Sequence, residues 1–268
     1  MGQVMFSIVV VCLNEGERLR DTVESIRQQT YDNYEIIVKD GLSTDDSLRL
    51  LPEDERIKLY RMADKGIYDA MNQAAEKVRG DFIFFLNCGD SFYGEEVLAK
   101  TAEQIAVRSV NGEAVFYGDI FEKVTKERVK SNPRMDAFGC YRNVPCHQAC
   151  FYSADLIRQK DFDVNYKVRA DYEHFLWCFF RGKAQMVSMP FIVANYEGDG
   201  FSETKENRKR SAREHREIVK KYMSVRQVFY YRMLMVLSLA PLRTRIARNK
   251  TTAHFYNKLK ELFYRMRG

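Results

Sequence analysis

The chain has 268 residues, of which 46% are hydrophobic and 30% charged, and this composition is typical of a folded soluble protein. It excludes a disordered chain, a collagen-like chain and a membrane protein with several spans. The length allows one large α/β domain with an appendage, or two small domains.

The net charge of +6 is distributed unevenly along the chain. Residues 1–200 carry 25 Lys and Arg against 32 Asp and Glu, a net charge of −7, whereas residues 201–268 carry 18 against 5, a net charge of +13. The sequence therefore predicts a main domain over residues 1–200 and a basic extension over residues 201–268. Basic extensions bind polyanions, and the candidates are nucleic acid and an anionic membrane surface.

The first ninety residues alternate between strand patterns and helix patterns. The expected strands are Phe6–Leu13, Tyr34–Asp40, Ile57–Met62 and Asp81–Asn87. The expected helices are Glu15–Gln29, a short one that ends with SLRLL (47–51), and Gly66–Gly80. Such alternation predicts a mostly parallel sheet that is covered by helices.

After residue 110 the alternation is less regular. The expected strands are residues 114–124, 127–130 and 148–152, with a pair of strands in 184–196, and the expected helices are 153–160 and 170–182. We expect these strands to extend the first sheet. From Ser202 onward the pattern is helical throughout.

The six cysteines are scattered, and they do not form two C-x-x-C pairs at the spacing of a zinc finger. Cys146, His147 and Cys150 could form a metal site, but the spacing favours free buried thiols in a reducing cytoplasm. The apolar run near the N-terminus has only about eight residues and no basic segment before it, so it is interpreted as a strand rather than a signal peptide.

Acidic and amide side chains follow four of the predicted strands, where ligands bind in open α/β sheets. These residues are Asn14 and Glu15, Asp40, Asp64 with the neighbouring Lys65, and Asn87 with Asp90. The sequence lacks the glycine-rich dinucleotide and P-loop motifs, and it also lacks the G-x-S-x-G and H-E-x-x-H motifs. What remains is carboxylate chemistry, which can hold a divalent cation against phosphate or deprotonate a hydroxyl group.

Several of these residues also have a purely structural interpretation. Asp40 can accept hydrogen bonds from a base or a ribose, or it can form the turn at Asp40-Gly41. Asp90 can be a metal ligand, because an unpaired charge next to the core is costly, or it can cap a helix that starts near residue 94. Lys65 can contact a phosphate or lie exposed on the surface.

Four longer stretches carry a family resemblance. They are SIVVVCLNEGERLRDTVESIRQQTYDNYEIIVKDGLSTDDS, DKGIYDAMNQAAEKVRGDFIFFLNCGD, HQACFYSADLIRQ and RADYEHFLW, in this order within residues 5–200. Together they resemble the family 2 glycosyltransferases of the GT-A fold that act in bacterial surface polysaccharide synthesis. The resemblance implies a mixed, mostly parallel sheet flanked by helices. It also implies inverting transfer of a sugar from a nucleotide-diphosphate sugar, expected to be a UDP-sugar, to a hydroxyl group of a glycan.

The resemblance also implies roles for the residues at the strand ends. Asp40 would bind the uracil or ribose of the donor, with Asp64 in the same pocket. The acidic metal motif of the family falls on Asn87-Cys88-Gly89-Asp90, in which only Asp90 retains a carboxylate. Mg²⁺ or Mn²⁺ would therefore be held by Asp90, with the donor diphosphate as a major source of ligands.

Two further positions match the family in the second half of the chain. Asp171 falls where the family has its general base, with Glu173 as the second candidate, and His147 falls in a stretch that lines the cleft near the diphosphate and the acceptor. On the residues alone, Asp171 and Glu173 could instead be the acidic first turn of a helix. His147 could equally be a core histidine.

The basic extension contains an apolar segment, residues 227–250, with Arg232 inside it and Arg243, Arg245 and Arg248 behind it. It is too short and too interrupted to span a bilayer. It predicts a helix in the membrane interface, with Phe229, Tyr230 and Tyr231 at the acyl boundary. Residues 254–267 repeat the pattern, and both helices could instead pack on the main domain or on a second subunit of a homo-oligomer.

A polyprenyl diphosphate-linked sugar as the acceptor would explain both halves of the chain. We therefore expect a cytoplasmic protein that lies peripherally on the inner face of the cell membrane. Two other functions are considered: a non-catalytic module that binds a nucleotide-sugar or a polysaccharide, and nucleic-acid binding through the basic extension. The aliphatic runs of the extension argue against a nucleic-acid partner.

Overall fold

The computed structural model describes residues 3–108, 112–198, 204–237 and 258. Its strands are β1 (Phe6–Cys12), β2 (Tyr34–Asp40), β3 (Ile57–Arg61), β4 (Phe82–Phe85), β5 (Ser91–Phe92), β6 (Ala114–Glu122), β7 (Glu127–Val129), β8 (Cys150–Ser153) and β9 (Gln185–Tyr196). Its helices are α1 (Glu17–Arg27), α2 (Ile67–Ala75), α3 (Val97–Val107), α4 (Ala137–Arg142), the 3-10 helix η1 (His147–Ala149), α5 (Ala154–Gln159), α6 (Ala170–Phe180), α7 (Lys205–Tyr222) and α8 (Val225–Leu237).

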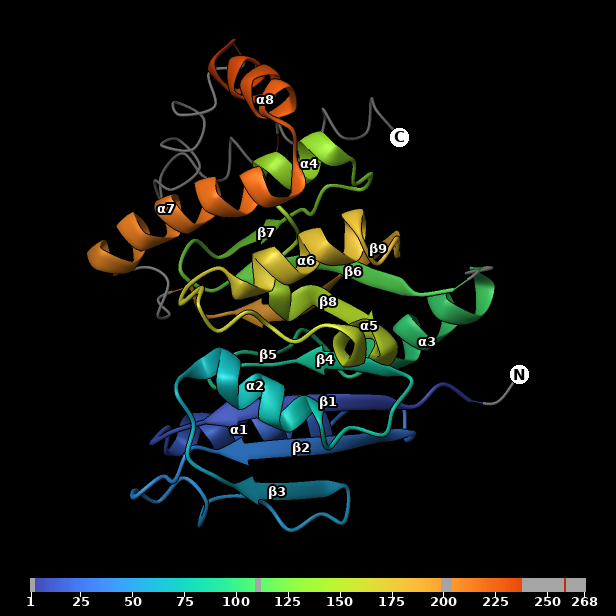
Figure 1. Cartoon of the computed structure of the whole chain (residues 1–268). Coiled ribbons are helices and arrows are strands. Elements are labelled where there is room, and N and C mark those ends of the chain that lie inside the picture. The colour runs from blue at the N-terminus through green and yellow to red at the C-terminus, as the bar shows by residue number, and fades with distance from the viewer. Residues whose placement is uncertain (1–2, 109–111, 199–203, 238–257, 259–268) are drawn as a thin grey trace.

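The described strands form one mixed sheet in the order β3-β2-β1-β4-β8-β6-β9-β5, and β7 pairs with β6 (Figure 1). Strands β1 to β4 are parallel to one another. β6 and β9 run in the same direction, whereas β5, β7 and β8 run in the opposite one. The expected mixed, mostly parallel sheet flanked by helices is therefore confirmed.

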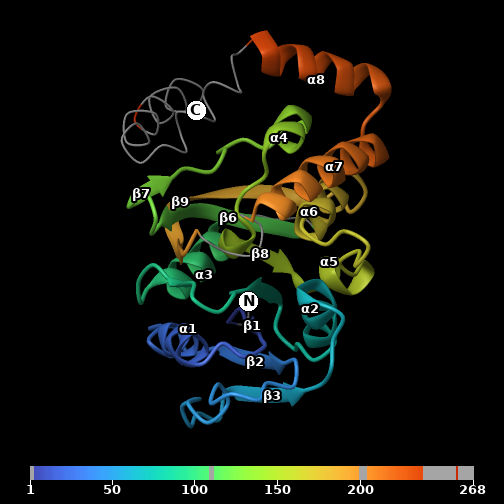
Figure 2. The same ribbon diagram turned by 90° about the vertical axis from the view of Figure 1, so that its left-hand side faces the viewer.

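Helices cover both faces of this sheet, with α1 and α3 on one face and α2, α5 and α6 on the other (Figures 1 and 2). β1 and β2 are buried along their whole length, and the apolar β-branched runs Ile8–Val11 and Ile36–Val38 form their centres. Leu19, Val23 and Ile26 form the buried stripe of α1, at the spacings of four and three that the sequence shows.

Helix α7 packs as part of the same core. Its side chains Ile218 and Val219, with Met223 directly after the helix, belong to the buried cluster that contains Phe175 and Leu176 of α6. The predicted boundary at residue 200 falls within residues 199–203, which lie outside the described residues.

Helix α8 lies outward of α4 and α7 (Figure 1). Its side chains Phe229 and Tyr230 are 66% and 59% exposed, as expected of residues available to a membrane. Tyr231 is partly buried, with its ring 5.4 Å from that of Phe138 and 5.5 Å from that of Tyr141, so it contacts α4. Among the helices that the structure describes, none is long and apolar enough to cross a membrane. The predicted helix 254–267 and Arg243, Arg245 and Arg248 lie outside the described residues.

Two predicted elements differ from the structure. Residues 47–51 form turns rather than a short helix. The Ser47 hydroxyl there bonds to Asp45 and accepts from the amides of Glu15 and Gly16, so it ties this segment to the loop after β1. Residues 184–196 form one strand rather than two, because register shifts around Asp119 in its pairing with β6 keep the strand continuous through Pro190.

Candidate active site

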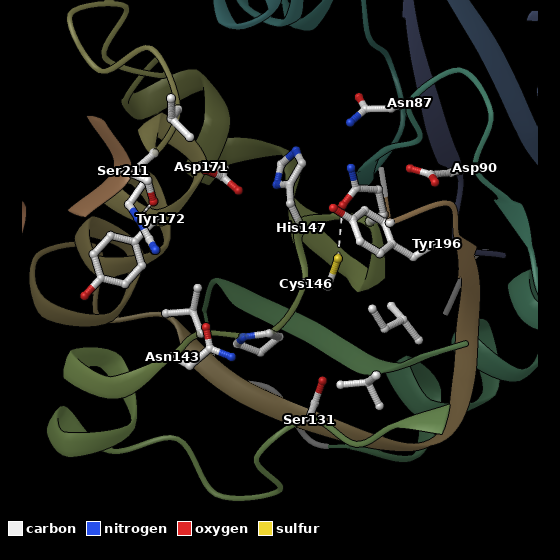
Figure 3. A pocket seen from close by; sticks show the side chains of 18 of the residues that line it. Asn87, Asp90, Ser131, Asn143, Cys146, His147, Asp171, Tyr172, Tyr196 and Ser211 are labelled. Carbon is white, nitrogen blue, oxygen red and sulfur yellow. Dashed lines mark hydrogen bonds between the residues drawn. The ribbon is translucent and has the colours of Figure 1, made fainter. Parts of the chain in front are cut away.

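A cavity of about 1650 Å³ lies between the carboxyl ends of β1 and β4, the loop before α4, and the first turns of α6 and α7 (Figure 3). Five of the residues predicted from the sequence line it: Glu15, Asn87, Asp90, His147 and Asp171. Glu15, Asn87 and Asp90 meet because the parallel strands β1 and β4 place their carboxyl ends at one edge of the sheet. His147 comes to this edge from η1, directly before the antiparallel strand β8, and Asp171 comes from the first turn of α6.

Asp171 stands in the first turn of α6, and Figure 3 shows it across the cavity from Asp90. Its Oδ1 accepts a hydrogen bond from the Tyr68 hydroxyl at 2.9 Å. Burial and the neighbouring Asp171 carboxylate raise the pKa of Tyr68 well above its usual value, so Tyr68 stays a neutral donor. The sequence contained Tyr68 next to Lys65-Gly66, but only the fold brings it to Asp171.

Glu173, the second candidate base, lies elsewhere. Its fully buried carboxylate binds Lys160 at 2.7 Å, Lys221 at 2.6 Å and the hydroxyl of Tyr222. Burial opposes ionisation, but these three partners outweigh it and hold the pKa of Glu173 below its usual value. Glu173 therefore ties α6 to α7 and does not line the cavity.

The segment that leads into α6 is held by Glu214 of α7. This carboxylate is 3% exposed and accepts the backbone N–H groups of Lys167, Val168 and Arg169, each at 3.0 Å. Three donors on one buried carboxylate fix the backbone two residues before Asp171. Nothing in the charged sequence of residues 203–223 singles out Glu214, because its role depends on contacts with a segment 45 residues away.

Asp90 lies in the turn that follows β4, where its amide binds the Asn87 carbonyl at 3.0 Å. Its carboxylate is 4% exposed and accepts the backbone N–H of Glu197 at 2.8 Å. The N-cap of α3 is Glu96, so Asp90 does not cap that helix. Asn87 Oδ1 is buried without a hydrogen-bond partner among the described residues. The turn therefore offers a carboxylate and an amide oxygen to the cavity.

Asp90→Asn is expected to stabilise the chain in a pH-dependent manner. Burial raises the pKa of Asp90 from 3.8 to about 6, so the protonated form favours folding and this contribution is lost as the pH rises through 6. Asn keeps an acceptor for the Glu197 amide. We expect it to raise the free energy of unfolding by about 2–3 kcal/mol at pH 8 and to change it little near pH 4. Urea unfolding of both chains at pH 4 and pH 8 measures this change in the free energy of unfolding. An equal change at the two pH values would contradict the prediction.

A guanidinium group lies beside Asp90. Arg18 donates to the Cys88 carbonyl at 3.0 Å and pairs with Glu15 at 3.1 Å and with Glu197. Burial raises the pKa of Glu15. Our sequence reasoning missed Arg18 and Glu197, although Glu197 directly follows the end of β9 and the same rule of strand ends would have found it.

The other predicted donor-binding residues lie beside the cavity rather than on its wall. Asp40 is fully buried, and it accepts the Leu42 and Ser43 amides at 3.1 Å and Arg61 Nε at 3.2 Å. Burial works against the charged form, but hydrogen bonds from Ser43 and Arg61 outweigh it and lower the pKa of Asp40. Asp40 therefore forms the turn at Asp40-Gly41, which is the structural role that the sequence allowed.

Asn14, Asp64 and Lys65 belong to the same edge of the sheet. Asn14 Oδ1 accepts the Thr44 amide at 2.9 Å. Asp64 pairs with the buried Lys39 and lies next to Gly41, where an added Cβ would come within 2.8 Å of Asp64 Oδ2. The side chain of Lys65 is exposed. Asp40 and Asp64 therefore lie close together, whereas Lys65 points to solvent.

His147 lies between Asp171 and Asp90 in Figure 3. Its ring stacks on Phe85 at 5.2 Å, and burial lowers its pKa, so the imidazole is neutral at pH 7. Nε2 is buried without a hydrogen-bond partner among the described residues, and the His147 residue lines the cavity. A neutral imidazole nitrogen here can bind a polar group of a ligand.

The cysteines do not form a metal centre in the described residues. All six are free. The Cys146 sulfur lies 3.1 Å from Gln148 Oε1, and the Cys150 sulfur lies 3.2 Å from the Cys146 carbonyl. Within the described ranges no three His, Cys, Asp or Glu side chains converge to hold a metal ion. The interpretation of the cysteines as free thiols therefore agrees with the structure.

Known glycosyltransferases share this structure. A mannosyltransferase of Pyrobaculum calidifontis, in complex with GDP-Man and Mn²⁺, matches 99% of this chain and 83% of its own, with a TM-score of 0.64 and 15% identity. S. aureus TarS in complex with UDP-GlcNAc matches 85% of this chain and 69% of its own, with a TM-score of 0.62 and 14% identity. At these identities the matches show the fold alone, which is the GT-A fold.

The sequence comparisons are more specific. The PGL/p-HBAD biosynthesis glycosyltransferase of Mycobacterium tuberculosis is 33% identical over 211 residues, which cover 76% of this chain and 81% of the relative. An uncharacterized glycosyltransferase of the same organism is 31% identical over 192 residues, which cover 70% of this chain and 71% of the relative. Residues 7–171 match the model of glycosyl transferase family 2. The chain is therefore a glycosyltransferase that belongs to family 2.

Proposed function

We propose that the chain transfers a sugar from a UDP-sugar to a hydroxyl group of a glycan acceptor, with inversion at the anomeric carbon. The observation that carries this proposal is the position of Asp90 and Asp171 on opposite sides of one cavity (Figure 3). Asp90 lies on the side where the donor diphosphate and its metal ion would bind. Asp171 lies on the opposite side, from which the acceptor hydroxyl would attack. The two solved structures of similar fold were obtained with UDP-GlcNAc and with GDP-Man, which supports a nucleotide-diphosphate sugar as the donor; the choice of UDP follows the family resemblance.

In this mechanism Asp171 accepts the proton of the acceptor hydroxyl as its oxygen attacks the anomeric carbon. The bond to the diphosphate breaks on the opposite face, and UDP leaves. Tyr68 orients the Asp171 carboxylate through its hydrogen bond. The neutral His147 lies between the two carboxylates and can bind a phosphate or hydroxyl oxygen.

A divalent cation fits the turn after β4. Asp90 supplies a carboxylate, and the buried, unpartnered Oδ1 of Asn87 supplies a second oxygen. Mg²⁺ commonly takes one or two protein carboxylates and completes its shell with substrate phosphates and water. Mg²⁺ or Mn²⁺, bound there with the donor diphosphate, would neutralise the charge of the leaving group, and the Mn²⁺ complex of the mannosyltransferase supports this assignment.

The nucleoside would bind at the neighbouring edge of the sheet. Asp40 and Asp64 would bind the uracil or the ribose, and Asn14, Glu15 and Lys65 complete the proposed donor-binding set. Ser43 and Arg61 hold the Asp40 carboxylate in place, so its position is set before the donor arrives.

Donor binding tests the proposal directly. The full chain with Mn²⁺ is screened against UDP-Glc, UDP-Gal, UDP-GlcNAc, UDP-GalNAc and GDP-sugars by thermal unfolding, and one UDP-sugar is expected to raise Tm more than the others. A ligand at 100 times its Kd adds about 2.7 kcal/mol to the free energy of unfolding. Stabilisation by GDP-sugars alone would exclude the UDP donor. A transferred sugar with retained anomeric configuration, seen by NMR, would exclude inversion.

We further propose that the acceptor is lipid-linked and that α8 contacts an anionic membrane on its cytoplasmic side. The exposed Phe229 and Leu237 lie on α8 together with Arg226 and Arg232, so this helix presents apolar side chains for the bilayer and cations for anionic headgroups on its surface. In flotation with anionic liposomes the full chain should float, and Phe229→Asp with Leu237→Asp should not. Val107→Asp, at a 78% exposed position of α3, is the control, and flotation of both variants would exclude the contact.

A further inference from the structure

Arg169 stands at the beginning of α6, on the side of the cavity that holds Asp171. It is the N-cap residue of the helix, and it lines the cavity. Figure 3 shows Asp171, Tyr172 and Ser211 together on this side, away from Asp90. Two of them hold the Arg169 guanidinium: its Nε donates to the Ser211 hydroxyl at 2.7 Å, and its central carbon lies 5.3 Å from the centre of the Tyr172 ring.

Arginine at this position is unfavourable for local stability. N-cap positions favour Ser, Thr, Asp and Asn, whose side-chain oxygens accept from the first helical amides, and Arg169 forms no such bond. A cation at a helix N-terminus also opposes the helix dipole. The backbone there is fixed instead by Glu214, which accepts the amide of Arg169 and the two amides before it. Exceptions to local preference of this kind are expected at functional sites, so we examined what Arg169 can bind.

The outer part of the Arg169 guanidinium is available to a ligand. Among the described residues it forms no ion pair, and its two Nη groups have no hydrogen-bond partner. The bond to Ser211 and the stacking on Tyr172 restrict its orientation. A guanidinium held in this way presents a fixed set of N–H donors, which can bind neighbouring oxygen atoms of one ligand.

The charges beside Arg169 favour an uncharged ligand. The Asp171 carboxylate belongs to the first turn of the same helix, and Asp136 lines the cavity together with Arg134. An anion bound to Arg169 would lie near Asp171, which would repel it. Three other cations of the lining already interact with other groups of the chain: Lys130, Arg142 and Arg208. Two adjacent hydroxyl groups suit the site better, because one can accept from Arg169 while the other donates to Asp171.

The cavity has room for such a ligand beside the donor. Its volume of about 1650 Å³ exceeds the range of about 300–1,000 Å³ that is typical for one bound small molecule. The proposed donor-binding residues lie toward Asp90 and the neighbouring sheet edge. A sugar at Arg169 would therefore lie on the side from which the acceptor attacks.

We infer that Arg169 binds a neutral acceptor sugar, by donating from its Nη groups to the hydroxyl next to the one that attacks. This inference rests on the proposed function, because it concerns the acceptor whose proton passes to Asp171. With one hydroxyl held by Arg169, only its neighbour on the ring reaches the base. Arg169 thereby determines which hydroxyl group receives the sugar.

Transfer to simple glycosides tests the inference. The full chain receives Mn²⁺, the UDP-sugar found in the screen, and the p-nitrophenyl glycoside of glucose, galactose, mannose or glucuronic acid. We expect transfer to a neutral glycoside and none to the glucuronide. Arg169→Gln should lower kcat/KM for that acceptor by about ten- to hundredfold, the usual effect of losing a hydrogen bond from a charged donor. UDP affinity and the slow hydrolysis of the donor by water should not change.

Two further variants and a modified acceptor make the test specific. Arg181→Gln, at the C-cap of the same helix and outside the cavity lining, is the matched control and should transfer at the wild-type rate. Arg169→Lys keeps the charge but loses the planar set of donors, so it should not restore transfer. NMR of the product identifies the attacking hydroxyl. An acceptor that lacks the adjacent hydroxyl should be a poor substrate for the wild type, and Arg169→Gln should add little to this loss.

The outcomes separate this inference from the proposed function. Failure of UDP to bind the wild-type chain would refute the donor proposal itself. Normal UDP binding, with equal acceptor kcat/KM in the wild type and Arg169→Gln, would overturn the role of Arg169 alone. A parallel loss of donor hydrolysis, or additive losses with the deoxygenated acceptor, would show a structural role and would also overturn it. Transfer only to the glucuronide, or to no glycoside while the donor is hydrolysed, would exclude a neutral sugar at this position.

Discussion

Asp171→Asn is expected to lower kcat for glycosyl transfer by about 10²–10⁴, the usual contribution of a general base. Asn has nearly the same shape, and it can still accept the hydrogen bond from Tyr68, but it cannot take a proton from the acceptor hydroxyl. UDP-sugar affinity should change little, because the proposed donor-binding residues lie on the other side of the cavity. Steady-state rates with the donor found in the screen, together with calorimetry of donor binding, measure both quantities.

The matched control is Asp155→Asn on α5, whose exposed carboxylate pairs with Arg158 at 2.8 Å. It removes the same charge from the same kind of helix position, since Asp155 and Asp171 both lie in a first helical turn. Transfer at the wild-type rate in Asp171→Asn would show that another group is the base. A wild-type chain that binds the donor without any transfer or donor hydrolysis would favour the non-catalytic binding module.

Glu214→Ala is expected to lower both the stability and the activity of the chain. The buried carboxylate accepts three backbone N–H groups, and its loss leaves the buried amide of Val168 and the partly buried amides of Lys167 and Arg169 without partners; a buried unpaired donor costs about 1–3 kcal/mol. We therefore expect the free energy of unfolding to fall by about 3 kcal/mol or more. Because these amides belong to residues 167–169, the backbone before Asp171 should also loosen and kcat should fall. Urea unfolding and steady-state kinetics at a temperature where the variant stays folded measure the two effects.

Two variants of α7 make this test specific. Glu217→Ala removes an exposed carboxylate of the same helix, which pairs with Arg213 only at 3.9 Å, and it should change stability and kcat little. Glu214→Gln retains one acceptor oxygen, so its free energy of unfolding and its kcat should lie between those of the wild type and of Glu214→Ala. Equal unfolding free energies for the wild type and Glu214→Ala would show that Glu214 does not hold the segment.

The sheet could be predicted from local pattern. The apolar β-branched runs Ile8–Val11 and Ile36–Val38 are typical of strands with both faces covered, so they indicate buried parallel strands without reference to the rest of the chain. The predicted helix at residues 47–51 and the predicted pair of strands at 184–196 were both wrong. In both places contacts with distant residues determine the local structure. In the first segment the Ser47 hydroxyl bonds to the loop after β1, and in the second β9 stays continuous through Pro190 with register shifts in its pairing with β6.

Part of the candidate site follows from the same local reasoning. Parallel strands end at one edge, so Glu15, Asn87 and Asp90 could be assigned to a common cavity from their positions after strands. The environments of these residues could not be assigned in this way. That Asp40 pairs with Arg61, and Asp64 with Lys39, depends on which strands are neighbours in the sheet.

The sequence by itself determined the positions of the strands in the first half, the acidic strand ends and the family of the chain, because each of these depends on residues close together or on motifs in a set order. Only the tertiary structure showed that Asp171 lines the cavity and that Glu173 does not. Two residues apart on a helix, they point about 200° apart around its axis, and the packing of α6 decides which one faces the cavity. Only the tertiary structure, too, revealed that Glu214 holds the backbone before Asp171, since such a contact joins segments that no local pattern relates.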